Sequence, residues 1–330
     1  MAADGGTERM SSKKIVIIGG GAAGWYAAKR IRKNDPSAEV FLFEGTENAL
    51  YAKVRLPEYV AGVLPREKLF LPGAPDEGLK VFSGTPVLEI DRTKQQIVTA
   101  DARYDYDILL LATGASANVP PVPGLKNSAC VLRTITDADA LCCCKAENAI
   151  VLGGGLLGLE AAWALKERGM AVTVVEMADR LLPRQLNETE SARLLTAFTA
   201  LGMKVILGAS VTGCRDCKEL ELADGTTIAA DLLLVSAGIA PEKTLAEKAG
   251  LLCGRGVTVD RQMRTSDPCI YAAGDCAEID GRTVGLWIAA KDQGEAAADI
   301  ICGKRETFEP PVYMPKLKVS GIDFNQIRGA

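Results

Sequence analysis

Two stretches of the chain show the same succession of apolar and polar positions. In the first, an apolar run at residues 13–18 leads into a glycine-rich turn, then into a helical pattern at 25–32 and a second apolar run at 40–43. Short apolar runs bounded by turn residues are typical of buried parallel strands, and apolar positions three or four apart are typical of a helix. The succession therefore predicts a strand–turn–helix–strand unit.

The second stretch repeats this order, with apolar runs at 149–152 and 171–175 around a glycine turn and a helix that ends near Arg168. Each copy is followed by weaker alternating segments and then by a predicted strand that stops at a glycine, Gly114 in the first copy and Gly238 in the second. Repetition of a whole supersecondary unit indicates an internal duplication. The fold class we expect is α/β, with two Rossmann-like dinucleotide-binding domains.

Composition and charge narrow the chemistry. The length of 330 residues favours two domains, and a net charge of −4 favours neither nucleic acid nor an anionic membrane as a partner. The chain has no histidine, which excludes a Ser-His-Asp triad and a histidine-bound metal, and we predict no metal site. No apolar run is long enough to span a membrane, and residues 1–12 are polar, so we expect a disordered N-terminal tail and a cytoplasmic protein.

The first glycine turn has the spacing of a dinucleotide-binding motif. Gly19, Gly21 and Gly24 follow a predicted strand and open a predicted helix, and Glu44 ends the next strand. In this motif the first glycine makes the tight turn, the second lets the backbone approach a pyrophosphate, and the third lets helix and strand pack closely. The helix N-terminus then offers N–H groups to phosphate, and the carboxylate can bind ribose hydroxyls.

The second turn places Gly153, Gly155 and Gly158 in the same order, with Glu176 at the end of the following strand. A carboxylate at this position lies beside the 2′ oxygen of the adenosine ribose. It would repel a 2′-phosphate by up to ~4 kcal/mol at ~4 Å and an effective dielectric of about 20. We therefore expect NADH to be preferred over NADPH; the alternative is that Glu176 merely ends a strand in solvent.

A third glycine turn, Gly274-Asp275, follows another predicted strand and precedes an alanine-rich helix expected over residues 286–302. Asp275 can reach hydroxyl groups of an extended cofactor. The positive N-terminal end of that helix, near Leu286 and Trp287, can face the edge of a flavin that becomes anionic on reduction. The proline-rich residues 118–124 fit neither a strand nor a helix, so we expect a domain crossing there.

Taken together, these motifs resemble those of the FAD-dependent pyridine nucleotide oxidoreductases. Within that family, the chain is most similar to the NADH:rubredoxin reductase group and to the reductase part of NADH-dependent nitrite reductases. The resemblance extends over about residues 13–303. Besides the two glycine motifs and their acidic residues, it rests on segments 51–62, 111–114, 131–134, 180–186, 235–239 and 265–287.

The resemblance implies a division into domains. Residues 13–117 and 241–303 would form an FAD-binding domain, and residues 118–240 an NAD-binding domain. Residues 304–330 would be the remnant of a C-terminal interface domain, and residues 317–322 look like its first strand. The assignment of FAD to the first copy and NADH to the second follows from the family, because spacing alone leaves the order open.

The resemblance also implies roles for individual residues. Lys53 would contact the FAD pyrophosphate, Val87 the adenine through its backbone, and Arg133 the FAD. Asp275 would bind the ribityl chain, and Glu160 would lie where nicotinamide and flavin meet. Lys53 and Glu160 are the expected catalytic residues. The other expected cofactor-binding residues are Ala22, Ala23, Ala112, Thr113, Gly114, Leu156, Leu157, Gly238, Gly274, Leu286 and Trp287.

The chain departs from relatives in the wider family. Glu58 stands where relatives that resemble ferredoxin reductases carry a lysine near flavin N5, which leaves the partner of Glu160 open. The Cys-x4-Cys pair of the disulfide reductases is absent. Cys214 and Cys217 form a C-x-x-C pair, but they follow the second glycine motif in a predicted hairpin, so catalytic cysteine chemistry is disfavoured.

These features predict an NADH-dependent oxidoreductase that passes hydride from NADH to FAD and then single electrons to a redox protein such as rubredoxin. Hydride transfer between stacked rings needs no protein acid or base, which suits a chain without histidine. Two alternatives stay open: an NADH oxidase that uses oxygen, although residues 42–58 contain no cysteine, and a reductase module of a larger redox complex. We expect a monomer or a weak homodimer.

Overall fold

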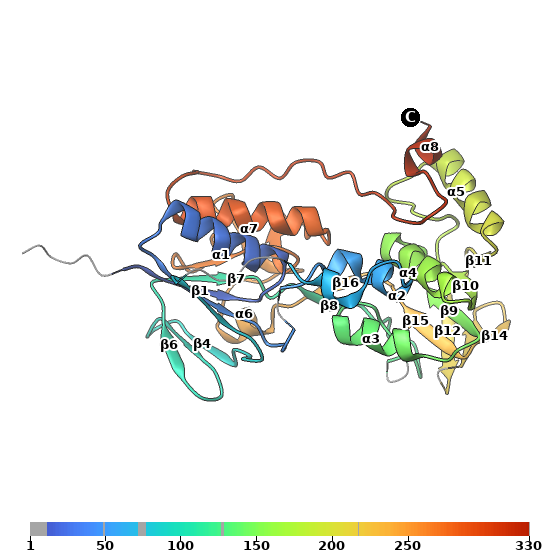
Figure 1. The fold of residues 1–330 in the computed structure, drawn as a ribbon, viewed down its shortest axis with the longest axis horizontal. Coiled ribbons are helices and arrows are strands. Elements are labelled where there is room, and N and C mark those ends of the chain that lie inside the picture. Colours follow the sequence, from blue (N-terminus) through green and yellow to red (C-terminus); the bar gives the residue numbers. More distant parts are fainter. Residues whose placement is uncertain (1–11, 49, 72–76, 127–128, 217, 330) are drawn as a thin grey trace, which may run out of the picture. The chain divides into compact units, whose positions relative to one another are not determined.

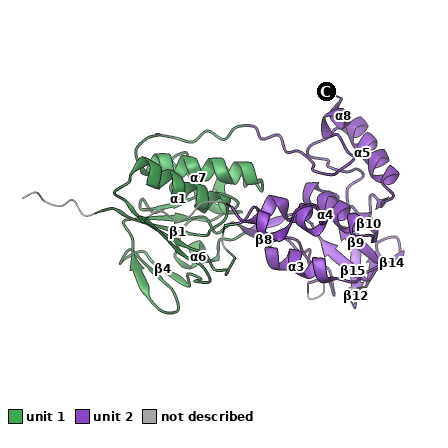
Figure 2. Cartoon of the chain, in the orientation of Figure 1, with its two compact units in different colours: residues 1–50, 72–114, 241–311 green, residues 51–71, 115–240, 312–330 purple. Residues whose placement is uncertain are grey.

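The structure, a computed structural model, describes residues 12–48, 50–71, 77–126, 129–216 and 218–329. The chain forms two compact units (Figure 2). Unit 1 comprises residues 1–50, 72–114 and 241–311, and unit 2 comprises residues 51–71, 115–240 and 312–330. Except for Ser12, the predicted N-terminal tail lies outside the described residues.

Unit 1 is built on a five-stranded parallel sheet in the order β18-β7-β1-β2-β3. The central strand β1 is paired on both sides and its last four residues are buried, as expected for a continuous apolar run in a parallel sheet. These strands are β1 (Lys14–Ile18), β2 (Glu39–Phe43), β3 (Leu79–Phe82), β7 (Ile108–Leu111) and β18 (Ile270–Ala272).

Two long helices, α1 (Ala22–Asn34) and α7 (Trp287–Ile301), lie side by side on one face of this sheet (Figure 1). Their contact includes a two-pronged ion pair, in which Arg30 Nε and Nη2 donate to the carboxylate of the buried Asp299 over 2.7 and 2.9 Å. Arg30 lowers the pKa of Asp299 below its ordinary value, against the opposing effect of burial. The pair joins segments that are far apart in the sequence.

Unit 2 repeats the plan with a four-stranded parallel sheet in the order β11-β10-β9-β15. Its central strand β9 lies between β10 and β15, just as β1 lies between β2 and β7. The predicted duplication is therefore visible in the strand order, and the predicted α/β class is confirmed. The strands are β9 (Asn148–Leu152), β10 (Ala171–Val175), β11 (Lys204–Ile206) and β15 (Leu232–Val235).

Each copy also carries a small three-stranded antiparallel sheet. In unit 1, Tyr104 packs edge-on against Phe43 and Phe82, with ring centroids 4.8 and 5.4 Å apart, which holds the small sheet against the parallel one. The small sheets comprise β4 (Glu89–Asp91), β5 (Gln96–Val98) and β6 (Arg103–Asp105) in unit 1, and β12 (Val211–Arg215), β13 (Glu219–Leu222) and β14 (Thr227–Ala229) in unit 2.

Most of the remaining elements are short, and the longer ones are helices of unit 2. Unit 1 also contains α6 (Thr244–Lys248) and the parallel pair β17 (Val257–Val259) and β19 (Ala277–Ile279). Unit 2 contains α2 (Leu56–Val60), α3 (Ile135–Cys143), α4 (Leu156–Glu167), α5 (Glu188–Ala200), α8 (Phe324–Arg328) and the single turns Lys53–Arg55 and Arg66–Leu69.

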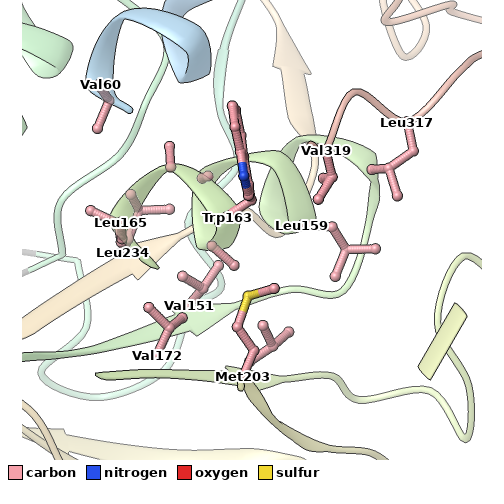
Figure 3. Packing of buried hydrophobic residues seen from close by; sticks show 14 of the residues in the cluster. Val60, Val151, Leu159, Trp163, Leu165, Val172, Met203, Leu234, Leu317 and Val319 are labelled. Carbon is pink, nitrogen blue, oxygen red and sulfur yellow. The ribbon is translucent and has the colours of Figure 1, made fainter. Parts of the chain in front are cut away.

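The main apolar core of unit 2 surrounds α4 (Figure 3). Leu159 and Trp163 of this helix belong to one buried cluster with Val151 of the sheet and with Leu317 and Val319 near the C-terminal end of the described chain. Residues 317–322 form no strand in the described part of the chain, so that prediction is wrong. A strand needs a hydrogen-bonded neighbour, and here the segment is held by its apolar side chains instead.

The crossing between units lies slightly before the proline-rich stretch where it was predicted. The compact units change at residues 114–115 and 240–241, where β8 (Ala115–Ala117) and β16 (Ile239–Pro241) pair with each other. Residues 118–124 follow within unit 2. In the described ranges, no helix is both long enough and apolar enough to cross a membrane.

Candidate functional site

Two glycines of the first turn are required by the protein itself. A Cβ on Gly19 would lie 2.1 Å from the carbonyl oxygen of Ala112, and its φ of +110° also disfavours any side chain. A Cβ on Gly24 would lie 1.9 Å from the carbonyl oxygen of Gly19. The first turn of α1 therefore packs directly on the end of β1, as the motif predicts.

Gly21 is different, because nothing in the protein requires a glycine there. Its φ of −71° suits any residue, and a Cβ would meet no heavy atom within 4 Å. The space beside Gly21 is what a pyrophosphate needs in order to approach the backbone at the start of α1. The structure thus separates two glycines that the fold requires from one that it does not.

The N-terminus of α1 is also left without a capping side chain. Its N-cap is Gly21, which makes no side-chain cap, and its first turn contains no acidic residue. The helices α3 and α5 contrast with it, since Thr134 and Asn187 close complete capping boxes at their starts. Unbonded helix N–H groups need another partner, and a phosphate is a suitable one.

The carboxylate of Glu44 is held against this turn by backbone groups. Gly20 donates its N–H to Glu44 Oε2 over 2.7 Å, and the Thr46 N–H and hydroxyl both donate to Oε1 over 3.0 Å. A carboxylate has about four acceptor positions, and three are used here, so Glu44 retains capacity for about one ribose hydroxyl unless a Thr46 bond is exchanged. The fixed orientation suits a ribose site.

Unit 2 repeats this geometry almost contact for contact. A Cβ on Gly153 would lie 2.3 Å from Ser236 O and one on Gly158 would lie 2.0 Å from Gly153 O, whereas Gly155 is open. Glu176 accepts from Gly154 N–H over 2.6 Å and from Ala178 N–H over 2.8 Å. The helix α4, which begins with Leu156 and Leu157, likewise has a glycine N-cap and no capping side chain.

The predicted third turn lies beside the first in unit 1. Gly274 adopts a φ of +86°, and its Cβ would lie 2.8 Å from the Cβ of Ala23. Asp275 follows as a partly exposed residue between the buried Gly274 and Cys276. The helix α7 then begins with Leu286 as its N-cap and Trp287 as its first residue, again without a capping side chain.

The end of β7 completes the set in unit 1. Ala112 is buried beside Gly19, and Thr113 donates its hydroxyl to Glu242 O over 2.6 Å. Gly114 has a φ of +74° and accepts from Glu242 N–H over 2.9 Å. Val87 is buried in the loop before β4. In unit 2, Gly238 has a φ of +97° and open space at its Cβ position.

Lys53 and Arg133 both belong to unit 2 by contact. The ammonium group of Lys53 lies 5.8 Å from the ring centroid of Tyr51, and Arg133 donates to the carbonyl oxygen of Ala115 over 3.0 Å. The predicted hairpin around Cys214 is present as β12 and β13, and Cys214 is buried. Cys217 lies outside the described residues.

Glu160 is buried on α4, with a relative exposure of 4%. Its Oε1 accepts from the backbone N–H of Lys318 over 2.9 Å. Burial raises the pKa of Glu160 to about 7, and the nearby Glu58 adds to the rise, while the Lys318 amide and charge oppose it. Glu58 itself pairs with Arg55 at 2.7 Å.

Sequence reasoning missed one glycine in each turn, the one that lies between the first and second glycines of the motif. Gly20 and Gly154 donate the N–H that fixes each carboxylate, and a Cβ at either position would lie 3.1 Å from that carboxylate's Oε2. Their place between two motif glycines was the available signal. The hydrogen bond that Gln293 accepts from the backbone amide of Gly274 was also missed. No short-range spacing marks a glutamine in the middle of a helix.

A family model described as pyridine nucleotide-disulphide oxidoreductase matches residues 13–294. The chain belongs to this family. It is accordingly an FAD-dependent pyridine nucleotide oxidoreductase, as the two glycine motifs predicted. The described residues fit both cofactors, because each unit pairs an open glycine and an uncapped helix with a fixed carboxylate.

Several relatives within this family are similar over most of this chain. The assimilatory nitrate reductase electron transfer subunit of Bacillus subtilis (strain 168) is 33% identical over 326 residues, which cover 95% of this chain and 42% of that protein. A NAD-dependent persulfide reductase from A. fulgidus matches with a TM-score of 0.88 at 33% identity, covering 93% of this chain and 62% of its own. The reductase in the covalent putidaredoxin reductase–putidaredoxin complex matches with a TM-score of 0.83 at 30% identity, covering 91% and 77%.

Substituting the two kinds of glycine should separate binding from folding. Gly21→Ala should change the stability of the apoprotein by less than about 1 kcal/mol, since only an N-cap preference changes. It should weaken FAD binding about 10- to 100-fold, because the methyl group takes up the space of the phosphate. Gly24→Ala should lower the free energy of unfolding by about 1–3 kcal/mol through overpacking. Urea unfolding of apoprotein and FAD titration measure the two effects, and unchanged FAD affinity in Gly21→Ala would contradict the phosphate assignment.

Glu160 should make stability depend on pH. Between pH 4.5 and about 7 the folded chain keeps a proton on Glu160 that the unfolded chain has released, so stability falls as pH rises through this range. Glu160→Gln keeps the carbonyl acceptor for Lys318 and should remove this part of the slope, a gain on the order of 3 kcal/mol above pH 7. Urea unfolding at a series of pH values measures it. The exposed Glu167→Gln on the same helix should leave the slope unchanged, and an equal slope in both variants would refute the assignment.

Proposed function

We propose that this chain is an NADH-dependent FAD oxidoreductase that delivers electrons to a redox-protein acceptor such as rubredoxin. The observation that carries the proposal is the duplicated glycine turn, open at Gly21 and Gly155 and flanked by the fixed carboxylates of Glu44 and Glu176. When bound, the flavin accepts a hydride from NADH and releases electrons singly. The protein's part is to bind and orient the two cofactors.

We assign FAD to the first copy together with residues 241–303, and NAD to the second copy. The asymmetry between the units supports this order. In the described part of the chain, unit 1 packs a further glycine turn, at Gly274, and the middle of α7 against the start of α1, and α7 begins without a capping side chain. An extended cofactor with a ribityl chain and a flavin needs these extra contacts, with Asp275 at the hydroxyls and the α7 N-terminus toward the ring.

The geometry of Glu176 supports the preference for NADH. Two backbone amides hold its carboxylate at the end of β10, so the charge cannot swing away from an incoming 2′-phosphate without losing both hydrogen bonds. The ribose of NADH presents hydroxyls at the same place, and hydroxyls donate to a carboxylate. Charge repulsion and lost hydrogen bonds therefore act together against NADPH.

The proposed electron acceptor is inferred from similar proteins. The similarity to an electron transfer subunit of nitrate reductase and to a reductase solved in a covalent complex with putidaredoxin supports a protein acceptor that takes single electrons. The chain spans 42% of that nitrate reductase subunit, which favours, as a second candidate, a reductase module acting within a larger redox complex. Residues 42–58 contain no cysteine, which disfavours oxygen as the acceptor.

An anaerobic titration of the FAD-reconstituted chain with NADH tests the proposal. The yellow absorbance of the flavin should bleach with about one NADH per flavin, and a flavin that stays oxidised refutes the function. Stopped-flow mixing of the reduced chain with oxidised rubredoxin then tests the acceptor. Hydrogen peroxide formed at the rate of NADH consumption would instead establish an oxidase.

Replacement of Glu176 should relax the coenzyme preference. Glu176→Gln removes the charge and keeps an acceptor for one backbone amide, so the ratio of kcat/KM for NADH to that for NADPH should fall about 10- to 100-fold. Steady-state kinetics with a dye acceptor measures the ratio for both coenzymes. Asp179→Asn, which removes an exposed carboxylate three residues further along, is the matched control and should leave the ratio unchanged. The same ratio in Glu176→Gln and the unchanged chain would count against the assignment.

A further inference from the structure

Gln293 is a buried polar side chain for which the glycine motifs provide no role. It lies in the middle of α7 with a relative exposure of 2%, on a buried face that also contains Ala289, Ala290 and Ala297. Glutamine is rarely buried to this extent unless it is hydrogen-bonded, since a buried amide without partners costs free energy. Its Oε1 accepts from the backbone N–H of Gly274 over 2.8 Å.

That hydrogen bond holds the turn that carries Asp275. Other backbone bonds join the turn to the end of β7, to itself and to β17: Ala273 N–H donates to Leu111 O over 2.9 Å, Ala277 N–H donates to Gly274 O over 3.0 Å, and Val257 N–H donates to Cys276 O over 2.8 Å. Gln293 adds the tie between the turn and α7. Because Gly274 and Cys276 are buried on either side, the backbone of this turn decides where the Asp275 side chain is directed.

The same part of α7 also contacts the start of α1, directly after the first glycine turn. A Cβ on Gly294, the next residue, would lie 2.2 Å from the carbonyl oxygen of Ala23, and a Cβ on Gly274 would lie 2.8 Å from the Cβ of Ala23. Ala23 is the second residue of α1. Residues 293 and 294 therefore join the Gly274 turn and the start of α1 into one packed group, with no room for either to shift alone.

We propose that Gln293 is a positioning residue for the FAD site, which orients Asp275 relative to the N-terminus of α1 by fixing the amide of Gly274. The inference rests on the proposed binding of FAD by unit 1. Without the side-chain carbonyl, the buried Gly274 N–H loses its acceptor, and the turn relaxes in order to find another. The apoprotein then has to reorder this turn when it binds FAD, and affinity falls.

The test compares two variants of α7 as apoproteins. Gln293→Met keeps the length and flexibility of the side chain and removes the acceptor, whereas Ile301→Ala removes buried apolar volume on the same helix. Both should lower the thermal midpoint of the apoprotein. Only Gln293→Met should raise the Kd for FAD, by about 10-fold or more, and speed hydrogen exchange in peptides that contain Gly274. Calorimetric FAD titration and exchange mass spectrometry provide these readouts.

The outcomes separate the inference from the function on which it rests. If the unchanged chain binds no FAD, the proposed function fails. If the unchanged chain binds FAD and Gln293→Met binds it with the same Kd as Ile301→Ala, the positioning role is refuted while the function stands. Gln293→Glu retains an oxygen acceptor and serves as the second variant, including where Gln293→Met fails to fold. Its peptides containing Gly274 should exchange at nearly the unchanged rate, and fast exchange there would overturn the proposal.

Discussion

The structure depends on one close approach, that of a helix start to the end of a buried strand. In each unit the third glycine of the motif lets the helix lie against the carbonyl of the first glycine, at a separation that leaves no space for a Cβ. This contact forces the helix to begin at the strand end, where no side chain is placed to cap it. The same constraint therefore closes the fold and leaves backbone N–H groups available for phosphate.

Because of the duplication, each unit contains one such turn. The elements that surround the two turns differ. Both copies hold a carboxylate beside the turn through the amide of the middle glycine. Around the first copy, α7 and the Gly274 turn add a further strand end and a further helix without a capping side chain. Around the second, the capped helix α5 and the segment from residue 312 onward complete the core.

Two buried polar side chains show how distant segments complete these units. Gln293 accepts from the amide of Gly274. Glu160 accepts from the amide of Lys318, which is 158 residues further along the chain. A buried polar group is tolerated where it has such a partner, and its removal leaves the partner unsatisfied. Both contacts hold a backbone segment in place.

The sequence alone determined the features that arise from short-range spacing. Strand and helix periodicity, the two glycine motifs and the acids Glu44 and Glu176 depend on neighbours within one strand–helix–strand unit, so local sterics and hydrogen bonding already specify them. Only the tertiary structure decided the partners of Glu160, Gln293 and Arg30, and the absence of a strand at residues 317–322. The partners of Glu160 and Arg30 lie more than a hundred residues away, and Gln293 bonds a turn 19 residues before it in another element. In the described chain, residues 317–322 have no strand beside them to pair with. No local pattern records which group of another element reaches a buried side chain.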